Sequence, residues 1–250
     1  MANRFYVPGE QRSAKVRDLF AAIAPRYDLI NDLQSFGLHR WWKRRLIQLA
    51  GVRHGEHALD LCCGTGDLAF ALARRGAQVV GCDFSEAMLA VAQARFRKRL
   101  RAASAPNRPQ PATGNPKFLR GDALNLPFAD ASFHVVTIGY GLRNLADFEQ
   151  GLREMSRVAK PGGRLLVLDF GKPAHALWRA VYFGHLKWFV PLFGRIFCGD
   201  AATYAYILES LKHYPAQEGV AAKMRELRCA HVCVMNLLGG VMSINYGQKR

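Results

Sequence analysis

The chain has 250 residues, half of them hydrophobic, which is enough for one sizeable core and predicts a single domain. Its formal net charge of +16 favours polyanionic neighbours, namely nucleic acid, an anionic membrane surface or acidic ligands. The first residues lack the apolar segment of a secretory signal peptide. The longest uncharged run, residues 229–248, contains His231, Asn236 and the Gly239–Gly240 pair, and it fits two strands better than a membrane span.

The cysteines show no C-x-x-C pair and no other metal-ligand spacing. They are Cys62, Cys63, Cys82, Cys198, Cys229 and Cys233. We therefore expect reduced, packed thiols, no bound metal and a cytoplasmic protein.

Helices are predicted over residues 13–50, where apolar side chains recur at Val16, Leu19, Phe20 and Ile23 before a polar segment interrupts the pattern. Strands and helices then alternate. The predicted elements are a strand ending at Leu61, a helix at 67–75, a strand at 78–83 and a helix at 85–100 with Ser85 as its N-cap.

Residues 101–116 contain four prolines and no periodicity, so we expect a surface insertion there. The rest of the chain predicts strands near 117–120, 133–141 and 164–170, a helix at 145–158, further helices over 174–227 and two closing strands. Strands that alternate with helices predict a parallel sheet with right-handed crossovers.

The stretch LDLCCGTGD, residues 59–67, places Gly64, Thr65 and Gly66 at the carboxyl end of the first strand, where open parallel sheets bind their ligands. Glycine turns of this kind often bind phosphate, but Asp60 and Asp67 flank this one. At an effective dielectric near 20, a contact between like charges at about 4 Å costs roughly 4 kcal/mol. The turn therefore favours a cationic ligand. The alternative is that both carboxylates only cap the turn and the helix.

S-adenosylmethionine combines an adenosine with two cationic groups and has no phosphate, so carboxylates beside the turn suit it. Asp83 ends the second strand and can accept both ribose hydroxyls. Asp122 follows the third strand and can accept the adenine amino group, while the Ala123 N–H can donate to a ring nitrogen. The alternative for Asp122 is a plain turn residue.

Together these positions predict a class I S-adenosylmethionine-dependent methyltransferase of α/β class. Its sheet would be Rossmann-like, mostly parallel and seven-stranded, with N-terminal helices and a helical insertion before the last two strands.

Several motifs resemble the ubiquinone/menaquinone biosynthesis C-methyltransferase family, in order from about residue 15 to the C-terminus. They are YDLINDLQSFGLHRWWKR, LDLCCGTGDLA, IGYGLRN, REMSRVAKPGGRLLVLDFGKP and YAYILESLKHYP. The resemblance implies methylation of a ring carbon of a polyprenylated quinol, with S-adenosylmethionine as donor. It places the family's cofactor positions on Thr65, Asp83, Asp122, Ala123 and Gly139; the turn itself adds Asp60, Gly64 and Gly66.

The loop GYGLRN follows the fourth strand and should face the sulfonium, which makes Arg143 and Asn144 the candidate catalytic residues. Arginine stays protonated, so Arg143 would stabilise the phenolate or orient a water that accepts the proton. Alternatively, Arg143 pairs with Asp147 on the next helix. His39 and Asp169 are alternative proton acceptors, although His39 also fits a polar contact under the N-terminal helices.

An aromatic stripe runs along the helical stretch after residue 174, at Trp178, Tyr182, Leu186, Phe189 and Phe193. Arg179, Lys187 and Arg195 are interspersed with it. The stripe fits core packing and also a hydrophobic lid whose basic rim faces anionic lipid. We expect transient, peripheral association with the inner face of the membrane, and the resemblance leaves a homodimer open.

The preferred reaction is the conversion of demethylmenaquinol to menaquinol, and the benzoquinol precursor of ubiquinone is second. Other small-molecule methyltransferases, an RNA methyltransferase and a noncatalytic cofactor-binding scaffold are the alternatives. The run RFRKRLR, Arg95–Arg101, could contact phosphates or be a solvated helix end; no nucleic acid partner is expected.

The expected parts are a helical cap at 1–50, a cofactor-binding core at 51–172, a substrate lid at 173–228 and closing strands at 229–250.

Overall fold

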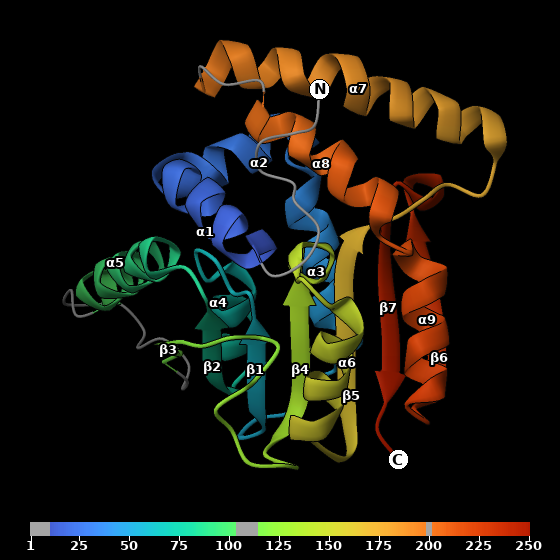
Figure 1. Ribbon diagram of the computed structural model, residues 1–250. Coiled ribbons are helices and arrows are strands. Elements are labelled where there is room, and N and C mark those ends of the chain that lie inside the picture. Colours follow the sequence, from blue (N-terminus) through green and yellow to red (C-terminus); the bar gives the residue numbers. More distant parts are fainter. Residues whose placement is uncertain (1–10, 104–114, 199–201) are drawn as a thin grey trace.

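Seven strands form one sheet in the order β3-β2-β1-β4-β5-β7-β6 in the computed structural model, which describes residues 11–103, 115–198 and 202–250 (Figure 1). The strands are β1 (His57–Leu61), β2 (Gln78–Asp83), β3 (Lys117–Arg120), β4 (Phe133–Gly139), β5 (Ala159–Phe170), β6 (Ala230–Leu237) and β7 (Met242–Gln248). β1 to β5 pair in parallel, while β7 runs antiparallel to both β5 and β6. The predicted α/β class and the mostly parallel, seven-stranded sheet are confirmed.

Helices cover both faces of the sheet and the end at which the parallel strands finish. They are α1 (Gln11–Ile23), α2 (Tyr27–Ser35), α3 (Leu38–Ala50), α4 (Asp67–Ala73), α5 (Glu86–Ala103), α6 (Phe148–Val158), α7 (Ala176–Cys198), α8 (Ala202–His213) and α9 (Ala216–Glu226). In Figure 1, α1, α2, α7 and α8 lie above the carboxyl ends of β1, β4 and β5. The N-terminal helices and the helical insertion therefore meet over the edge where ligands bind in such sheets.

The core lies on both faces of the sheet because successive side chains of a strand point to opposite sides. In β5, Leu165 and Val167 pack on the face covered by α6 and α9, and Leu166 and Leu168 pack on the face covered by α3 and α4. This arrangement leaves the carboxyl ends of the strands as the edge available for polar chemistry.

The start of α6 differs from the sequence prediction because a local cap sets where the helix begins. The helix predicted from residue 145 begins at Phe148, because Leu142–Asn144 form a 3-10 turn and the Asp147 side chain accepts the Gln150 N–H as N-cap. The predicted insertion at 101–116 lies for the most part outside the described residues. Ser85 is confirmed as the cap of α5, with its hydroxyl 3.4 Å from the Met88 nitrogen.

No helix in the described part of the chain is long and apolar enough to cross a membrane. The described cysteines are free; Cys63, Cys82 and Cys229 are buried as expected, Cys62 is half-buried, and Cys233 is exposed, against the expectation of packed thiols. The side chain of Cys198 lies outside the described set.

Candidate functional site

The turn between β1 and α4 is built from left-handed backbone at the end of a buried strand. Gly64 and Gly66 have φ values of 53° and 86°, which glycine adopts without strain. Cys62 adopts φ of 49° without being glycine, a conformation that often marks functional sites. The turn therefore requires glycine at both positions for its backbone geometry.

Asp60 is buried behind this turn and holds it in place. One carboxylate oxygen accepts the Ala69 N–H at 3.0 Å in the first turns of α4, and the other accepts the Thr137 hydroxyl at 2.9 Å. Burial raises the pKa of Asp60 to about 7, against the effect of these two hydrogen bonds. Near neutral pH the group is thus only partly ionised.

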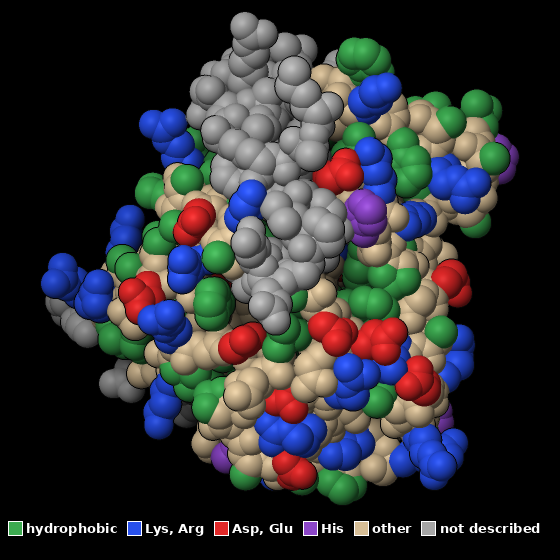
Figure 2. All heavy atoms as spheres, in the orientation of Figure 1, with side chains coloured by type: hydrophobic (Ala, Val, Ile, Leu, Met, Phe, Trp, Pro, Cys, Tyr) green, Lys and Arg blue, Asp and Glu red, His purple; other side chains and the backbone are tan. Residues whose placement is uncertain are grey.

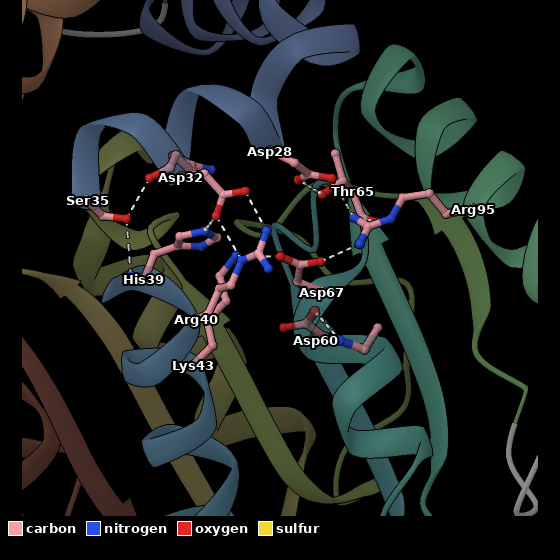
Figure 3. A network of polar contacts seen from close by, with 12 residues as sticks. Asp28, Asp32, Ser35, His39, Arg40, Lys43, Asp60, Thr65, Asp67 and Arg95 are labelled. Atoms are coloured by element: carbon pink, nitrogen blue, oxygen red, sulfur yellow. Dashed lines mark hydrogen bonds and ion pairs between the residues drawn. The ribbon is translucent and has the colours of Figure 1, made fainter. Parts of the chain in front are cut away.

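Asp67, at the start of α4, is neutralised by two cations (Figure 3). Its carboxylate oxygens lie 2.8 Å from Lys43 Nζ on α3 and 2.6 Å from Arg95 Nη2 on α5. Burial opposes ionisation, but the two cations lower the pKa of Asp67, so it stays charged. Asp67 therefore links α4 to α3 and α5 through ion pairs.

A first cavity, here called the turn cavity, lies at the carboxyl ends of β1, β2 and β4. Five of the predicted cofactor positions line it: Gly64, Asp83, Asp122, Ala123 and Gly139. Asn144 lines it as well. Asp60, Thr65 and Gly66 do not line it.

Thr65 and Gly66 contact neighbouring protein side chains and do not face the turn cavity. The Thr65 hydroxyl donates to Asp28 at 2.7 Å, which ties the turn to α2. A Cβ on Gly66 would lie 2.9 Å from the Phe118 and Phe70 rings, so packing also requires a glycine there.

Asp83 joins the first two βα loops at the rim of the turn cavity. It accepts the Gly64 N–H and the Ser85 N–H, both at 2.8 Å. Burial raises the pKa of Asp83, and these N–H donors oppose the rise. A carboxylate has about four lone-pair sites, so Asp83 keeps acceptor capacity for the hydroxyls of a ribose.

Residues of the N-terminal helices form the opposite wall of the turn cavity, and the sequence analysis did not identify them. They are Val16, Arg17, Phe20 and Tyr27. The helical periodicity of residues 13–50 shows only that these side chains share helix faces, and it carries no signal for a ligand.

A second cavity of about 410 Å³, here called the apolar cavity, adjoins the turn cavity. Phe20, Tyr27 and Tyr140 line both cavities. The remaining wall comes mainly from α2, α3 and α7 and includes Trp178, Tyr182 and Leu186 of the predicted aromatic stripe. The side chains of Phe189, Phe193 and Arg195 lie outside the described set.

The apolar cavity also contains buried polar atoms that lack a hydrogen-bond partner among the described residues. They belong to the side chains of Asn31, Gln34, His39, Trp42, Tyr140 and Tyr182, which all line this cavity. Buried polar groups in native proteins normally have a partner. A ligand with a polar head and an apolar body would supply partners for them.

Arg143 lies in the wall of the apolar cavity and is 6% exposed. Its Nη1 donates to the Tyr140 carbonyl at 3.1 Å and to Asn144 Oδ1 at 2.9 Å, and its Nε lies 3.6 Å from Asp169. The ion-pair partner of Arg143 is Asp169, whereas Asp147, the alternative partner, caps α6 and lies 3.5 Å from an Arg153 nitrogen. Arg143 is thus a fixed cation in the wall of the apolar cavity.

The model of the ubiE/COQ5 methyltransferase family matches residues 9–249. The chain belongs to this family. It is 41% identical over 246 residues to the ubiquinone/menaquinone biosynthesis C-methyltransferase UbiE of Azotobacter vinelandii, covering 97% of this chain and 93% of that protein. The UbiE protein of Ectopseudomonas mendocina is also 41% identical, over 250 residues, with coverage of 97% and 92%. The protein is therefore an S-adenosylmethionine-dependent C-methyltransferase of the UbiE type.

Solved structures of other proteins have a similar fold. A SAM-dependent methyltransferase from Aquifex aeolicus has a TM-score of 0.54 at 15% identity, covering 83% of this chain and 89% of that one. The cyclase SpnF has a TM-score of 0.62 at 16% identity, covering 99% of both chains. Since a cyclase shares the fold, the family match and the site carry the functional argument.

The Asp83→Ala variant should bind S-adenosylmethionine more weakly by about 1.5–3 kcal/mol, the range for hydrogen bonds to a charged group. Calorimetric titration of the purified variant measures this loss. Glu86→Ala is the control, because Glu86 is an exposed carboxylate that pairs with Arg120 beside the same loop. Unchanged affinity in Asp83→Ala would remove Asp83 from the cofactor site.

Proposed function

We propose that this protein methylates a ring carbon of a polyprenylated quinol, with demethylmenaquinol as the preferred substrate. The benzoquinol precursor of ubiquinone is the second choice, because both present a phenolic ring on the same kind of isoprenoid tail. The observation that carries the proposal is the apolar cavity, which meets the turn cavity at Tyr27 and Tyr140 and holds buried polar groups.

The two ends of the apolar cavity suit the two ends of such a substrate. Tyr140 lies where the two cavities meet, and Arg143 and Tyr182 line the apolar cavity with it. The guanidinium and the two tyrosine hydroxyls offer donors to ring oxygens. Burial raises the pKa of both tyrosines, so they remain neutral donors. Toward the exterior, exposed apolar side chains such as Phe36 and Val181 suit an isoprenoid tail.

Methylation of carbon requires a nucleophilic ring carbon, and an ionised quinol hydroxyl supplies the electron density. S-adenosylmethionine, when bound, supplies the electrophilic methyl group. Asp83 and Asp122 would accept hydrogen bonds from ribose and adenine, and Gly64 and Gly139 would allow close approach of the backbone. Arg143 would stabilise the phenolate, and Asn144 would hold the guanidinium in position.

The parts of the chain would divide this work. Residues 1–50 would be the helical cap of a single methyltransferase domain, 51–172 its cofactor-binding core, 173–228 the substrate lid and 229–250 the closing strands. The cap supplies Phe20 and Tyr27, and the lid supplies Tyr182 and Leu186.

Exposed apolar side chains lie on the helices and the turn that line the apolar cavity; we call them the apolar rim, and we propose that they contact the bilayer in which the substrate resides. Its members belong to α2, the start of α3, α7 and the turn before β7: Leu29, Phe36, Leu38, Trp41, Leu177, Trp178, Val181, Trp188 and Leu238. Basic side chains are interspersed; the Lys187 Nζ lies 5.1 Å from the Trp188 ring centre. Figure 2 shows hydrophobic and basic groups together over the upper right end of α7. This composition suits an anionic membrane surface.

The substrate test uses labelled S-adenosylmethionine with reduced quinols, oxidised quinones and bulk RNA. We expect label in demethylmenaquinol, and none in the oxidised quinone, which has no hydroxyl to supply electron density. Label in RNA but in no quinol would overturn the function. Equal labelling of quinone and quinol would overturn the mechanism.

The Arg143→Ala variant should lose about 10²-fold or more in turnover, as is typical when a donor to a developing oxyanion is removed. Affinity for S-adenosylmethionine should change little, because Arg143 does not line the turn cavity. Turnover and calorimetric affinity are measured together, with Arg153→Ala on the exposed face of α6 as control. Near-normal turnover would assign Arg143 to a structural role.

The Trp188→Glu variant should bind vesicles of mixed neutral and anionic phospholipid at least about tenfold more weakly, since it places a charge in the apolar rim. Leu100→Glu is the control, because Leu100 is an exposed apolar residue of α5 away from the rim. Cosedimentation at several salt concentrations measures both the apolar and the ionic contribution. Equal binding of the two variants would contradict the proposed membrane contact.

A further inference from the structure

His39 lies between the apolar cavity and a polar groove on the other side of α3. The groove runs between α3, α4 and α5, and its wall includes Asp32, Lys43, Asp67 and Arg95. Of the described residues that line either space, His39 alone lines both. Its side chain is therefore placed to pass a proton from the apolar cavity to the polar groove.

Asp32 fixes the orientation of the His39 ring (Figure 3). The His39 Nε2 lies 2.7 Å from Asp32 Oδ1, and Arg40 donates to both carboxylate oxygens of Asp32, at 2.8 and 2.5 Å. The hydrogen bond from Arg40 lowers the pKa of Asp32, which keeps this carboxylate ionised. An ionised carboxylate can only accept a hydrogen bond, so Nε2 carries the hydrogen and Nδ1 carries the free lone pair.

The Nδ1 atom is buried and has no hydrogen-bond partner among the described residues. Burial lowers the pKa of His39, and Lys43 acts in the same direction. Asp32 and Asp67 oppose this effect. Near neutral pH the imidazole is thus a neutral base whose available lone pair is shielded from bulk water.

The next turn of α3 reaches the junction of the two cavities. Lys43, one turn further along α3, places its Nζ 5.7 Å from the centre of the Tyr140 ring, which lines both cavities. The rival base, Asp169, does not line the apolar cavity. Its carboxylate accepts the backbone N–H groups of Arg143 and Phe170, at 3.1 and 2.8 Å.

We propose that His39 is the general base that removes the proton of the quinol hydroxyl, with Asp32 as its positioning residue. The proposal rests on the proposed function. The proton moves from the hydroxyl oxygen to Nδ1, and the electron pair of the oxygen enters the ring. The ortho carbon forms its bond to the methyl group as the carbon–sulfur bond breaks toward sulfur. The ring carbon then loses its hydrogen as a proton, the oxygen regains one, and His39 releases its proton to water in the polar groove.

The test compares wild type, His39→Gln and Asp32→Asn over pH 5.5–9, under anaerobic conditions and with the quinol that the wild type methylates. The His213→Gln variant is the control, because His213 forms an exposed histidine–carboxylate pair with Glu209. Wild-type turnover should fall at acidic pH, with the midpoint of the fall below the ordinary histidine value of about 6.5, because burial lowers the pKa of His39 and protonation consumes the base. The control should keep this profile.

The His39→Gln variant should lose about 10²–10⁴-fold in turnover at pH 7, the usual contribution of a general base. Its rate should rise about tenfold per pH unit, because hydroxide must then replace the base. Asp32→Asn should lose about 10²-fold or more and shift the acid limb to lower pH, since Asp32 raises the His39 pKa. Both variants are checked for folding by their unfolding midpoints and for donor affinity by calorimetry.

A second measurement does not depend on turnover. Long-range nitrogen–proton NMR of the wild type should show His39 at pH 7 as the neutral Nε2–H form, assigned by loss of its signals in His39→Gln. An imidazolium or an Nδ1–H form at pH 7 would overturn the proposal. So would a uniform rate loss in His39→Gln with the wild-type pH profile, or normal turnover in that variant. Failure of the wild type to methylate any quinol would overturn the proposed function, and the base role with it.

Discussion

The carboxylate of Asp67 holds the N-terminal helices on the sheet, and both cavities depend on it. Lys43 ties it to α3 and Arg95 ties it to α5, while a second nitrogen of Arg95 lies 2.9 Å from Asp28 on α2. The side chains of Lys43, Asp67 and Arg95 are 13%, 26% and 27% exposed, so solvent screens them less than it screens a surface pair. These contacts therefore help to hold α2, which supplies Tyr27 to both cavities.

The same tie changes the electrostatic reasoning about the ligand. Charge beside the glycine turn indicated a cationic cofactor, and the family match supports S-adenosylmethionine as donor. Yet Asp67 is neutralised by its partners, and burial leaves Asp60 only partly ionised near neutral pH. The carboxylates that line the turn cavity are Asp83 and Asp122. The prediction of a cationic cofactor therefore holds, but the carboxylates that would attract it are Asp83 and Asp122, at the ends of the second and third strands.

Two adjoining cavities suit a reaction between two substrates, one polar and one apolar. The sheet contributes mainly to the turn cavity, whereas α2, α3 and α7 contribute most of the apolar cavity. A cyclase shares the overall fold, which agrees with the general finding that folds host many chemistries. In this protein the helices added around the sheet, with Tyr140 at the junction and Arg143 in the wall of the apolar cavity, are the parts that would select a quinol.

The sequence by itself determined the sheet, the glycine turn and the residues at the ends of the strands. Gly64, Asp83, Asp122 and Gly139 could be brought together in advance because carboxyl ends of parallel strands share one edge. Only the tertiary structure decided that Arg143 pairs with Asp169 and that His39 borders the apolar cavity. The physical reason is that these contacts join segments far apart in the chain, so they depend on how whole helices pack, whereas periodicity records only which face of an element is buried.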